Sequence, residues 1–242
     1  MFAAIFAFVF VTAYAADEIP SYIHVCGVKD PNYTECFVDN VNRVLGKLCL
    51  TGIPEFNVLP IEPVIIEEIV IYDTDKLKLN IKDSKVRGIC DFDITSSHII
   101  PETYYKFNFI LKHLTMNSTY DFDIRVLVSL ANKGIVYVSA DDVEGELTIE
   151  LKTVTKGGKT QIYVAKVTTN IDLKTFNYEF DDSEKDLVQL HEVMRNTISE
   201  SEKDIIIKVK PKLEEVVSKL SMSVINTILY DRYDQLFLAE TP

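Results

Sequence analysis

The chain has 242 residues, enough for one large domain or two small ones, and 47% of them are hydrophobic. This content is typical of a globular protein with a sizeable core. The net charge is -12, so polyanions are repelled over most of the surface. The charge therefore argues against nucleic acid and against an anionic membrane surface as main partners.

The N-terminal sixteen residues carry no charged side chain. Phe2 to Val11 is an apolar run, and the small-x-small pattern Ala13-Tyr14-Ala15 follows it. Together they are typical of a secretory signal peptide over residues 1–16. A membrane anchor is the alternative, but the run is shorter than the ~20 residues that a span needs. We therefore expect an extracellular mature chain, residues 17–242, forming a single domain without stable membrane insertion.

The chain has four cysteines. An extracellular protein lies in an oxidising compartment, where disulfides are favoured over thiols. Cys26 and Cys36 flank the turn-like segment Lys29-Asp30-Pro31-Asn32 and are the predicted pair. Closing this loop stabilises by about 2–3 kcal/mol in the chain-entropy account. Cys49 and Cys90 form a second bridge in one interpretation; in the other, Cys90 is a buried free thiol. No close C-x-x-C pair supports a metal site, and we expect neither a metal nor a cofactor.

Two tripeptides, at Asn32 and Asn117, match the N-x-S/T acceptor of N-glycosylation. In an extracellular chain, such asparagines lie on the surface when they are used. The tripeptide also occurs by chance, so there are two interpretations: both asparagines are glycosylated, or the matches are coincidental.

The N-terminal part predicts one helix and an extended connector. Apolar residues recur at helical spacing from Thr34 to Leu50, with Thr34 as a candidate cap. Gly52 and Pro54 then end this helix. Three prolines in residues 52–64 exclude a helix there and predict an extended segment leading into strands.

Alternating apolar and polar residues predict an antiparallel meander with one wet face and one apolar face. In the first such segment, Leu77, Leu79 and Ile81 alternate with lysine and asparagine. Turns are predicted at Asn132-Lys133-Gly134 and Lys156-Gly157-Gly158. Further alternation occurs in the ranges Tyr105–Leu111, Tyr120–Val128, Leu147–Lys152 and Tyr163–Leu173.

The period changes from 2 to 3.6 after Asp181, and Ser183 is a candidate cap for a helix. From Ser201 to Tyr230, apolar residues recur at steps of three and four, which predicts a second, long amphipathic helix. Such a helix is on the order of 45 Å long and needs an extended partner, so we expect the sheet to curve around it. Pro211 is predicted to kink or divide it.

Three stretches stand out as motifs. Pro20 precedes the paired Cys26 and Cys36; Gly52-Ile53-Pro54-Glu55-Phe56 continues to Leu59-Pro60-Ile61-Glu62-Pro63-Val64; and Lys210-Pro211-Lys212-Leu213-Glu214-Glu215 is followed by Tyr233-Asp234-Gln235-Leu236-Phe237. Together they resemble the takeout and haemolymph juvenile-hormone-binding protein family of arthropods, over essentially the whole mature chain. The proline-framed segment is the most specific match. Departures are Arg232 in place of a common proline, Glu62 and Val64 for Asp and Leu, and the additional Cys49 and Cys90.

The resemblance implies an α+β fold in which a strongly curved antiparallel sheet wraps a long C-terminal helix and encloses an apolar tunnel. It also implies that Cys26 and Cys36 are disulfide-bonded. Members of the family carry lipophilic small molecules and are not enzymes. We therefore expect a secreted carrier of a juvenile-hormone-like terpenoid, a fatty acid or a similar molecule; a protein partner is not specified.

The candidate ligand-binding residues are those expected to face the tunnel. For each, ordinary core packing is the competing interpretation. Tyr105 and Tyr163 add hydroxyl groups that a ligand oxygen could engage. The set is Tyr105, Phe107, Phe109, Leu111, Phe122, Ile124, Val126, Tyr163, Val167 and Ile171 on strands, and Val209, Leu213, Val217 and Leu220 on the long helix.

Two other functions remain as alternatives. A secreted interaction or effector protein would keep the fold with a collapsed cavity. A hydrolase would need a nucleophile with a base in reach, but the sequence has no G-x-S-x-G or H-E-x-x-H motif. His113 continues the inward parity after Leu111 and is either a ligand contact or, as we favour, a surface histidine.

Overall fold

The computed structural model describes residues 19–125, 129–181 and 188–242. The predicted signal peptide, Val126 and the candidate cap Ser183 lie outside these ranges. The described elements, in chain order, are α1 (Tyr33–Leu50), the 3-10 turn η1 (Pro54–Phe56), β1 (Val64–Asp73), β2 (Leu77–Arg87), β3 (Phe92–Ile100), β4 (Tyr104–Arg125), β5 (Ser129–Lys156), β6 (Lys159–Asp172), β7 (Asn177–Phe180), α2 (Val188–Leu229) and α3 (Tyr233–Leu236).

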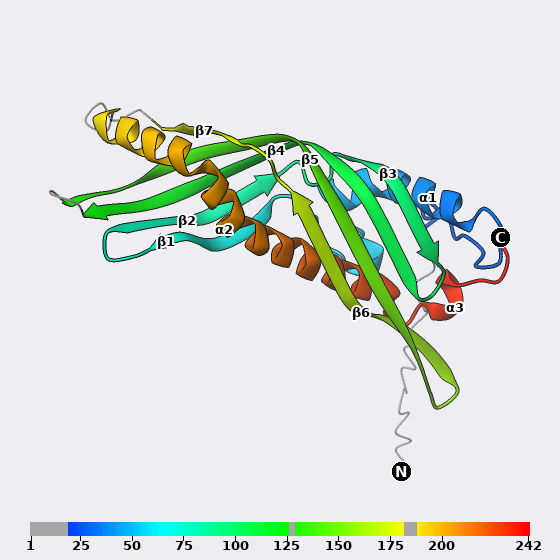
Figure 1. Ribbon diagram of the computed structural model, residues 1–242. Helices are drawn as coiled ribbons and strands as arrows, with labels where there is room; N and C mark the ends of the chain where they lie inside the picture. The colour runs from blue at the N-terminus through cyan, green and yellow to red at the C-terminus, as the bar shows by residue number, and fades with distance from the viewer. Residues whose placement is uncertain (1–18, 126–128, 182–187) are drawn as a thin grey trace, which may run out of the picture.

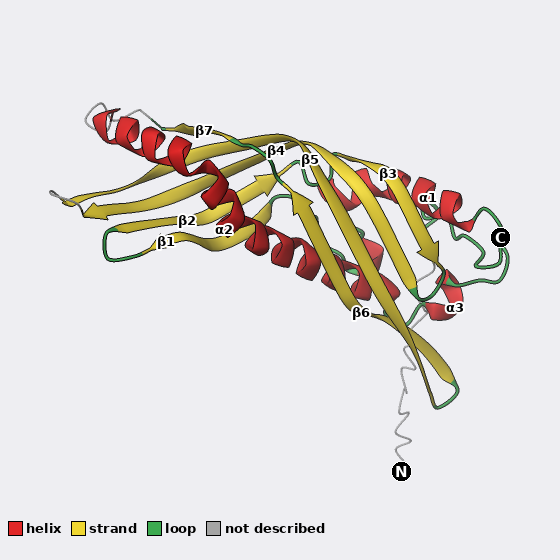
Figure 2. Ribbon diagram, viewed as in Figure 1, coloured by secondary structure: helices red, strands yellow, loops and turns green. Residues whose placement is uncertain are grey.

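The strands of the described ranges form one antiparallel sheet of seven strands, with the path β1-β2-β4-β5-β6. β4 and β5 run its whole length (Figure 1). At one end they are flanked by β2 and β7, and at the other by β3 and β6. The sheet curves around α2, as Figure 2 shows, which confirms the predicted α+β architecture of a long helix wrapped by an antiparallel sheet.

The two long strands exchange their inner and outer faces midway. On β4 the buried positions are Tyr105, Phe107 and Leu111, and then Ser118 and Tyr120, so the buried parity changes from odd to even. The register with β5 is the same on both sides of this point, so the two strands turn over together. Strand residues normally alternate strictly between the two faces of a sheet. Because the alternation shifts by one residue here, odd-numbered residues of β4 face inward in one half of the sheet and even-numbered residues face inward in the other.

The helix α2 is continuous for 42 residues and includes Pro211. It joins the two helices that the sequence predicted separately. Of the two effects predicted for Pro211, a kink or a division of the helix, the continuous helix excludes division. Figure 1 shows the helix changing direction near its middle, as expected where a proline removes one backbone hydrogen bond. Beyond its end, Arg232 Nη1 donates to the carbonyl oxygens of Thr227, Ile228 and Tyr230, which closes the C-terminal turn.

The Gly-Ile-Pro-Glu-Phe segment forms a tight turn with buried apolar side chains. Ile53 and Phe56 are each 1% exposed, and η1 occupies Pro54–Phe56, where we expected extended chain. Gly52 has φ +73°, and a Cβ there would lie 2.1 Å from the Val58 carbonyl oxygen. The Arg232 guanidinium lies over the Phe56 ring at 4.2 Å, a cation–π contact that joins the end of α2 to this segment.

Two disulfides are present, Cys26–Cys36 and Cys49–Cys90, with Cα–Cα distances of 6.0 and 6.2 Å. The second links the end of α1 to the turn between β2 and β3. Cys90 is therefore bonded, and its interpretation as a buried free thiol is wrong.

Two local predictions fail. The chain runs straight through Asn132-Lys133-Gly134 as part of β5, because these residues pair with β4. Thr34 does not cap α1: the N-cap residue is Asn32, without a side-chain cap bond. The turn at Lys156-Gly157-Gly158 is where the sequence placed it, since β5 ends at Lys156 and β6 begins at Lys159.

Candidate ligand-binding site

A cavity of about 170 Å³ lies between α2 and the half of the sheet formed by β1, β2, β7 and the adjoining parts of β4 and β5. It is not closed on every side. The elements contribute as follows: Val64, Ile66, Ile69 and Ile71 from β1; Leu79, Ile81 and Val86 from β2; Leu111, Leu114, Thr115, Met116 and Tyr120 from β4; Val136, Val138, Ser139, Ala140 and Val143 from β5; Ile171 from β6; Tyr178 and Phe180 from β7; Met194, Ile198, Ile205, Ile206, Val209, Leu213, Val216 and Val217 from α2; and Ile89, Leu173 and Phe176 from the connecting segments.

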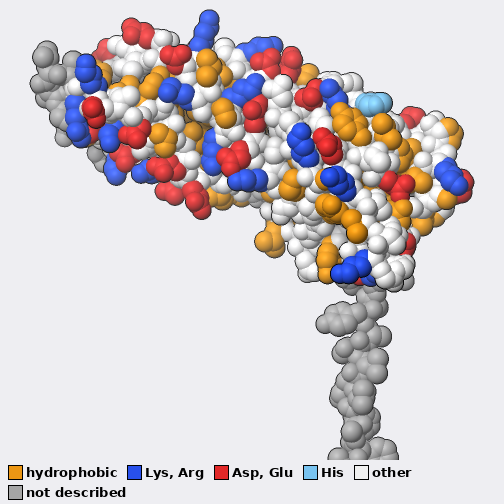
Figure 3. Space-filling model, turned by 60° about the horizontal axis from the view of Figure 1, so that its bottom comes forward, with side chains coloured by type: hydrophobic (Ala, Val, Ile, Leu, Met, Phe, Trp, Pro, Cys, Tyr) orange, Lys and Arg blue, Asp and Glu red, His pale blue; other side chains and the backbone are white. Residues whose placement is uncertain are grey.

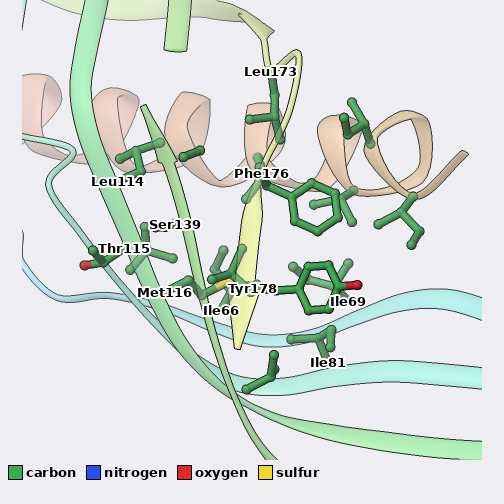
Figure 4. A pocket seen from close by; sticks show the side chains of 18 of the residues that line it. Ile66, Ile69, Ile81, Leu114, Thr115, Met116, Ser139, Leu173, Phe176 and Tyr178 are labelled. Atoms are coloured by element: carbon green, nitrogen blue, oxygen red, sulfur yellow. The ribbon is translucent and has the colours of Figure 1, made fainter. Parts of the chain in front are cut away.

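The hydroxyl groups of the two tyrosines at the cavity have partners in the protein. The Tyr178 hydroxyl donates to the carbonyl oxygen of Arg195 at 3.1 Å. The Tyr120 hydroxyl lies 2.7 Å from His191 Nε2, and His191 stacks on Phe180 with 4.8 Å between ring centroids. Figure 4 shows the Phe176 and Tyr178 rings side by side among mainly aliphatic side chains, with Thr115 and Ser139 also at the wall. The site is therefore suited to hydrocarbon.

Five candidates from the sequence line the cavity. They are Leu111 and Ile171 on strands, and Val209, Leu213 and Val217 on α2. The helix residues follow the three- and four-residue spacing that suggested them, since that spacing places them on one face. Strand and helix candidates thus meet in space at this half of the molecule.

Tyr105, Phe107 and Val167 lie instead in an apolar cluster at the other end, with α1 and α3. The hydroxyls of Tyr105 and Tyr33 are 2.9 Å apart, and burial raises the pKa of both tyrosines. The Tyr105 hydroxyl therefore already has a partner. In the range Tyr105–Leu111, Leu111 lines the cavity, whereas Tyr105 and Phe107 pack in that cluster.

Four further candidates do not line the cavity. Phe109 packs beside Gly145, whose missing side chain leaves room for its ring. Phe122 is 2% exposed and Ile124 packs with it in the core behind the cavity; Phe122 also lines a neighbouring pocket of about 10 Å³. Leu220 is half-buried outside the lining set. Phe109, Phe122 and Ile124 thus pack in the core, in agreement with the competing interpretation.

Tyr163 is 42% exposed, so its predicted inward orientation is wrong. Glu150 pairs with Lys166, whereas Leu151 pairs with Val164, which leaves Ala165 as an extra residue on β6. This β-bulge reverses the faces of the strand beyond it, so Ile162 and Val164 point inward.

The cavity residues of β1 and β7 were not among those predicted from the sequence. On β1, the inward residues change parity between Ile66 and Ile69, so a strict period of 2 does not find them. Phe176, Tyr178 and Phe180 do alternate with polar residues and were recognisable as a short strand.

The surface prediction for His113 agrees with the structure: its side chain is 55% exposed and bonds to Asp141. The acceptors Asn32 and Asn117 are exposed, and their glycosylation stays a prediction.

Within the described ranges, no group of three or more His, Cys, Asp or Glu side chains is arranged to hold a metal. In the same ranges, no helix combines the length and apolarity that crossing a membrane requires.

Solved structures of other proteins share parts of this architecture. The crystal structure of Epiphyas postvittana Takeout 1 is similar with a TM-score of 0.65 and 16% identity, covering 86% of this chain and 95% of that chain. Its fold is therefore shared. Lipopolysaccharide binding protein matches at TM-score 0.39 and 11% identity over 68% of this chain and 35% of that chain, too weak to carry an argument. No curated protein matches the sequence.

The family model for haemolymph juvenile hormone binding protein (JHBP) matches residues 4–238. This match spans nearly the whole chain and agrees with the motifs at Gly52–Phe56 and Tyr233–Phe237 and with the helix wrapped by a curved sheet. The chain belongs to the haemolymph juvenile hormone binding protein family.

Proposed function

We propose that the protein is a secreted carrier of a small lipophilic molecule, held in the cavity between α2 and the sheet. The observation that carries the proposal is the unfilled apolar interior of about 170 Å³. Protein interiors are ordinarily close-packed, and an empty apolar space costs stability. A ligand that fills the space restores the missing contacts and removes its own apolar surface from water, at ~25 cal/mol per Å².

The candidate cargo is a juvenile-hormone-like terpenoid, a fatty acid or a molecule of similar character. The family name supports the terpenoid, and the aliphatic wall supports both classes. Enclosure solubilises and protects such a cargo without chemistry on it, so the proposal requires neither a catalytic residue nor a cofactor. The alternative, an effector with a collapsed core, requires a filled interior, and the cavity favours the carrier.

Secretion is part of the proposal. It is supported by the apolar N-terminal run with its cleavage pattern and by the two disulfides, which persist in oxidising compartments. Expression of the full chain in eukaryotic cells tests it. We expect protein in the medium whose intact mass lacks residues 1–16, with added glycan if Asn32 or Asn117 is used; retention of the full-length chain inside the cell would contradict secretion.

Binding is tested with the uncharged fluorescent probe N-phenylnaphthylamine and the purified protein. We expect saturable binding and displacement by a fatty acid or a terpenoid. Val209→Phe fills the cavity and should weaken probe binding by roughly tenfold, the scale set by small changes of volume in an apolar pocket. Ile207→Phe is the matched control, because Ile207 lies two residues away and is 67% exposed.

The wild-type protein must bind the probe saturably for the proposal to stand. Equal effects of the two phenylalanine variants would show that the probe binds elsewhere. Mass spectrometry of lipids extracted from the secreted protein then identifies the natural cargo.

A further inference from the structure

The wall of the cavity has a chemical peculiarity: among the described residues, virtually no nitrogen or oxygen atom faces its interior. Ligand sites usually combine an apolar surface with a few polar groups that orient the ligand. Here the hydroxyl groups of the two tyrosines at the cavity serve other partners.

The two tyrosines at the cavity illustrate this. The hydroxyl of Tyr178 is engaged by the Arg195 carbonyl, and that of Tyr120 by His191, which is 1% exposed. In Figure 4, the hydroxyl of Thr115 points away from the Phe176 and Tyr178 rings.

Backbone groups are engaged as well. The surrounding strands pair with one another: β1 with β2, β2 with β4, and β5 with both β4 and β7. The fourth side of the cavity is α2, a helix in which Pro211 removes one backbone hydrogen bond. The wall as a whole exposes almost no polar atom, of side chain or backbone, to the interior.

A ligand oxygen placed against such a wall loses its bonds to water and gains none in return. Since the cavity is not closed on every side, a polar group at the end of a chain keeps its hydration at the opening. A polar group in the middle of the chain does not.

We infer that the cargo is a lipid with an uninterrupted hydrocarbon segment inside the cavity and its polar group at one end only. This inference rests on the proposed function and narrows it: fatty acids and chain alcohols fit, whereas chains that carry a hydroxyl, ketone or epoxide in the middle are rejected. Selection is by the absence of polar partners, not by recognition of a head group.

Positional isomers provide the test, because they have the same formula and nearly the same overall polarity. Hexadecanol with a terminal hydroxyl is compared with its isomer that carries the hydroxyl on the eighth carbon, each displacing N-phenylnaphthylamine. We expect the mid-chain isomer to need a concentration between about ten- and 100-fold higher, the range in which an apolar pocket discriminates against an added hydroxyl.

A variant pair tests whether the wall is responsible. Val138→Thr introduces a hydroxyl at the cavity with little change of volume, and we expect it to narrow the difference between the isomers. Val154→Thr is the matched control on the same strand, 47% exposed and outside the cavity; it should leave the difference unchanged. Thermal unfolding of both variants verifies that they fold.

The outcomes separate the inference from the function beneath it. Absence of saturable probe binding by the wild-type protein contradicts the carrier proposal. Saturable probe binding with equal displacement by the two isomers, or stronger displacement by the mid-chain isomer, overturns the inference and leaves the carrier proposal intact. The isomer comparison uses the wild-type protein, so it holds even if Val138→Thr does not fold.

Discussion

Ile162 and Tyr163 are neighbours on β6 with opposite surroundings. Ile162 is 4% exposed and Tyr163 is 42% exposed. The bulge at Ala165 decides which of them points to the core, because one extra residue gives the two parts of the strand on either side of it opposite inward parities. At this scale the inward set of β6 is determined by a single residue.

Alanine substitution at these neighbours should therefore give very different stabilities. Ile162→Ala leaves a cavity in the core cluster and should lower the free energy of unfolding by about 2–5 kcal/mol. Tyr163→Ala should change it by about 0.5 kcal/mol or less, as at most surface positions. Urea unfolding monitored by circular dichroism measures both. A larger loss for Tyr163→Ala would mean that the bulge is misplaced.

Tyr22 provides a pH-dependent prediction. Burial, followed by the hydrogen bond to Glu55 Oε2 at 2.9 Å, raises the pKa of Tyr22 from 10.0 to about 12. Because the folded state holds this proton more tightly, its contribution to stability is complete below pH 10 and is lost as the pH rises toward 12. The free energy of unfolding should fall in this interval, and less steeply in Tyr22→Phe.

Absorbance titration of tyrosinate gives a direct check. The wild-type curve minus that of Tyr22→Phe should show one group titrating near pH 12. A difference curve centred near 10, the ordinary pKa of tyrosine, would contradict the shift.

At the scale of elements, α2 is attached to the edge of β6 by polar side chains. The backbone N–H of Ile171 donates to Glu214 Oε1 at 2.9 Å, and that of Val164 donates to Asn226 Oδ1 at 2.8 Å. Between them, the hydroxyls of Ser218 and Thr169 are 2.8 Å apart. An edge strand exposes unpaired amides, so these oxygens complete the sheet as a further strand would.

Removing one such acceptor should destabilise the edge. Asn226→Ala leaves the Val164 amide without its partner and should cost about 1–3 kcal/mol. Asn226→Asp keeps an acceptor oxygen and should retain most of the stability. Ser223→Ala, at an exposed position on the same helix, is the control. Chemical unfolding measures the free energy of unfolding of the three variants. An equal loss for Asn226→Ala and Ser223→Ala would show that the Asn226 acceptor does not stabilise the edge of β6.

At the scale of the molecule, the two halves of the sheet have different interiors. Side chains from α1 and α3 fill one half, while the other holds the cavity. The Cys49–Cys90 disulfide connects them, since Cys49 is on α1 and Cys90 follows the cavity residue Ile89. The Glu62 carboxylate supports the same turn by accepting hydrogen bonds from the amides of Gly88 and Cys90, both at 3.0 Å.

Replacing each cysteine pair by alanine should reveal the difference in loop length. The Cys49–Cys90 bridge closes 41 residues and the Cys26–Cys36 bridge closes 10. In the chain-entropy account, their loss costs about 4 and about 2–3 kcal/mol respectively. Unfolding in guanidinium measures both. The order should be reversed only if the N-terminal bridge holds native contacts of its own.

Much of the molecule was predictable from the sequence. The spacing of Val209, Leu213 and Val217 is local, and a helix converts that spacing directly into one face. The motif at Gly52–Phe56 identified the family, and with it the wrapped helix, because Gly52 and the buried Ile53 and Phe56 permit few substitutions.

The position of the cavity was decided by the tertiary structure alone. Strict alternation along a strand predicts which residues share a face only as far as the strand neither turns over nor bulges. Here β4 and β5 turn over together, and β6 bulges at Ala165. These changes depend on the pairing of strands far apart in the chain. They direct Tyr105 and Phe107 into an apolar cluster and bring β1, β7 and the part of α2 from Met194 to Val217 around the cavity.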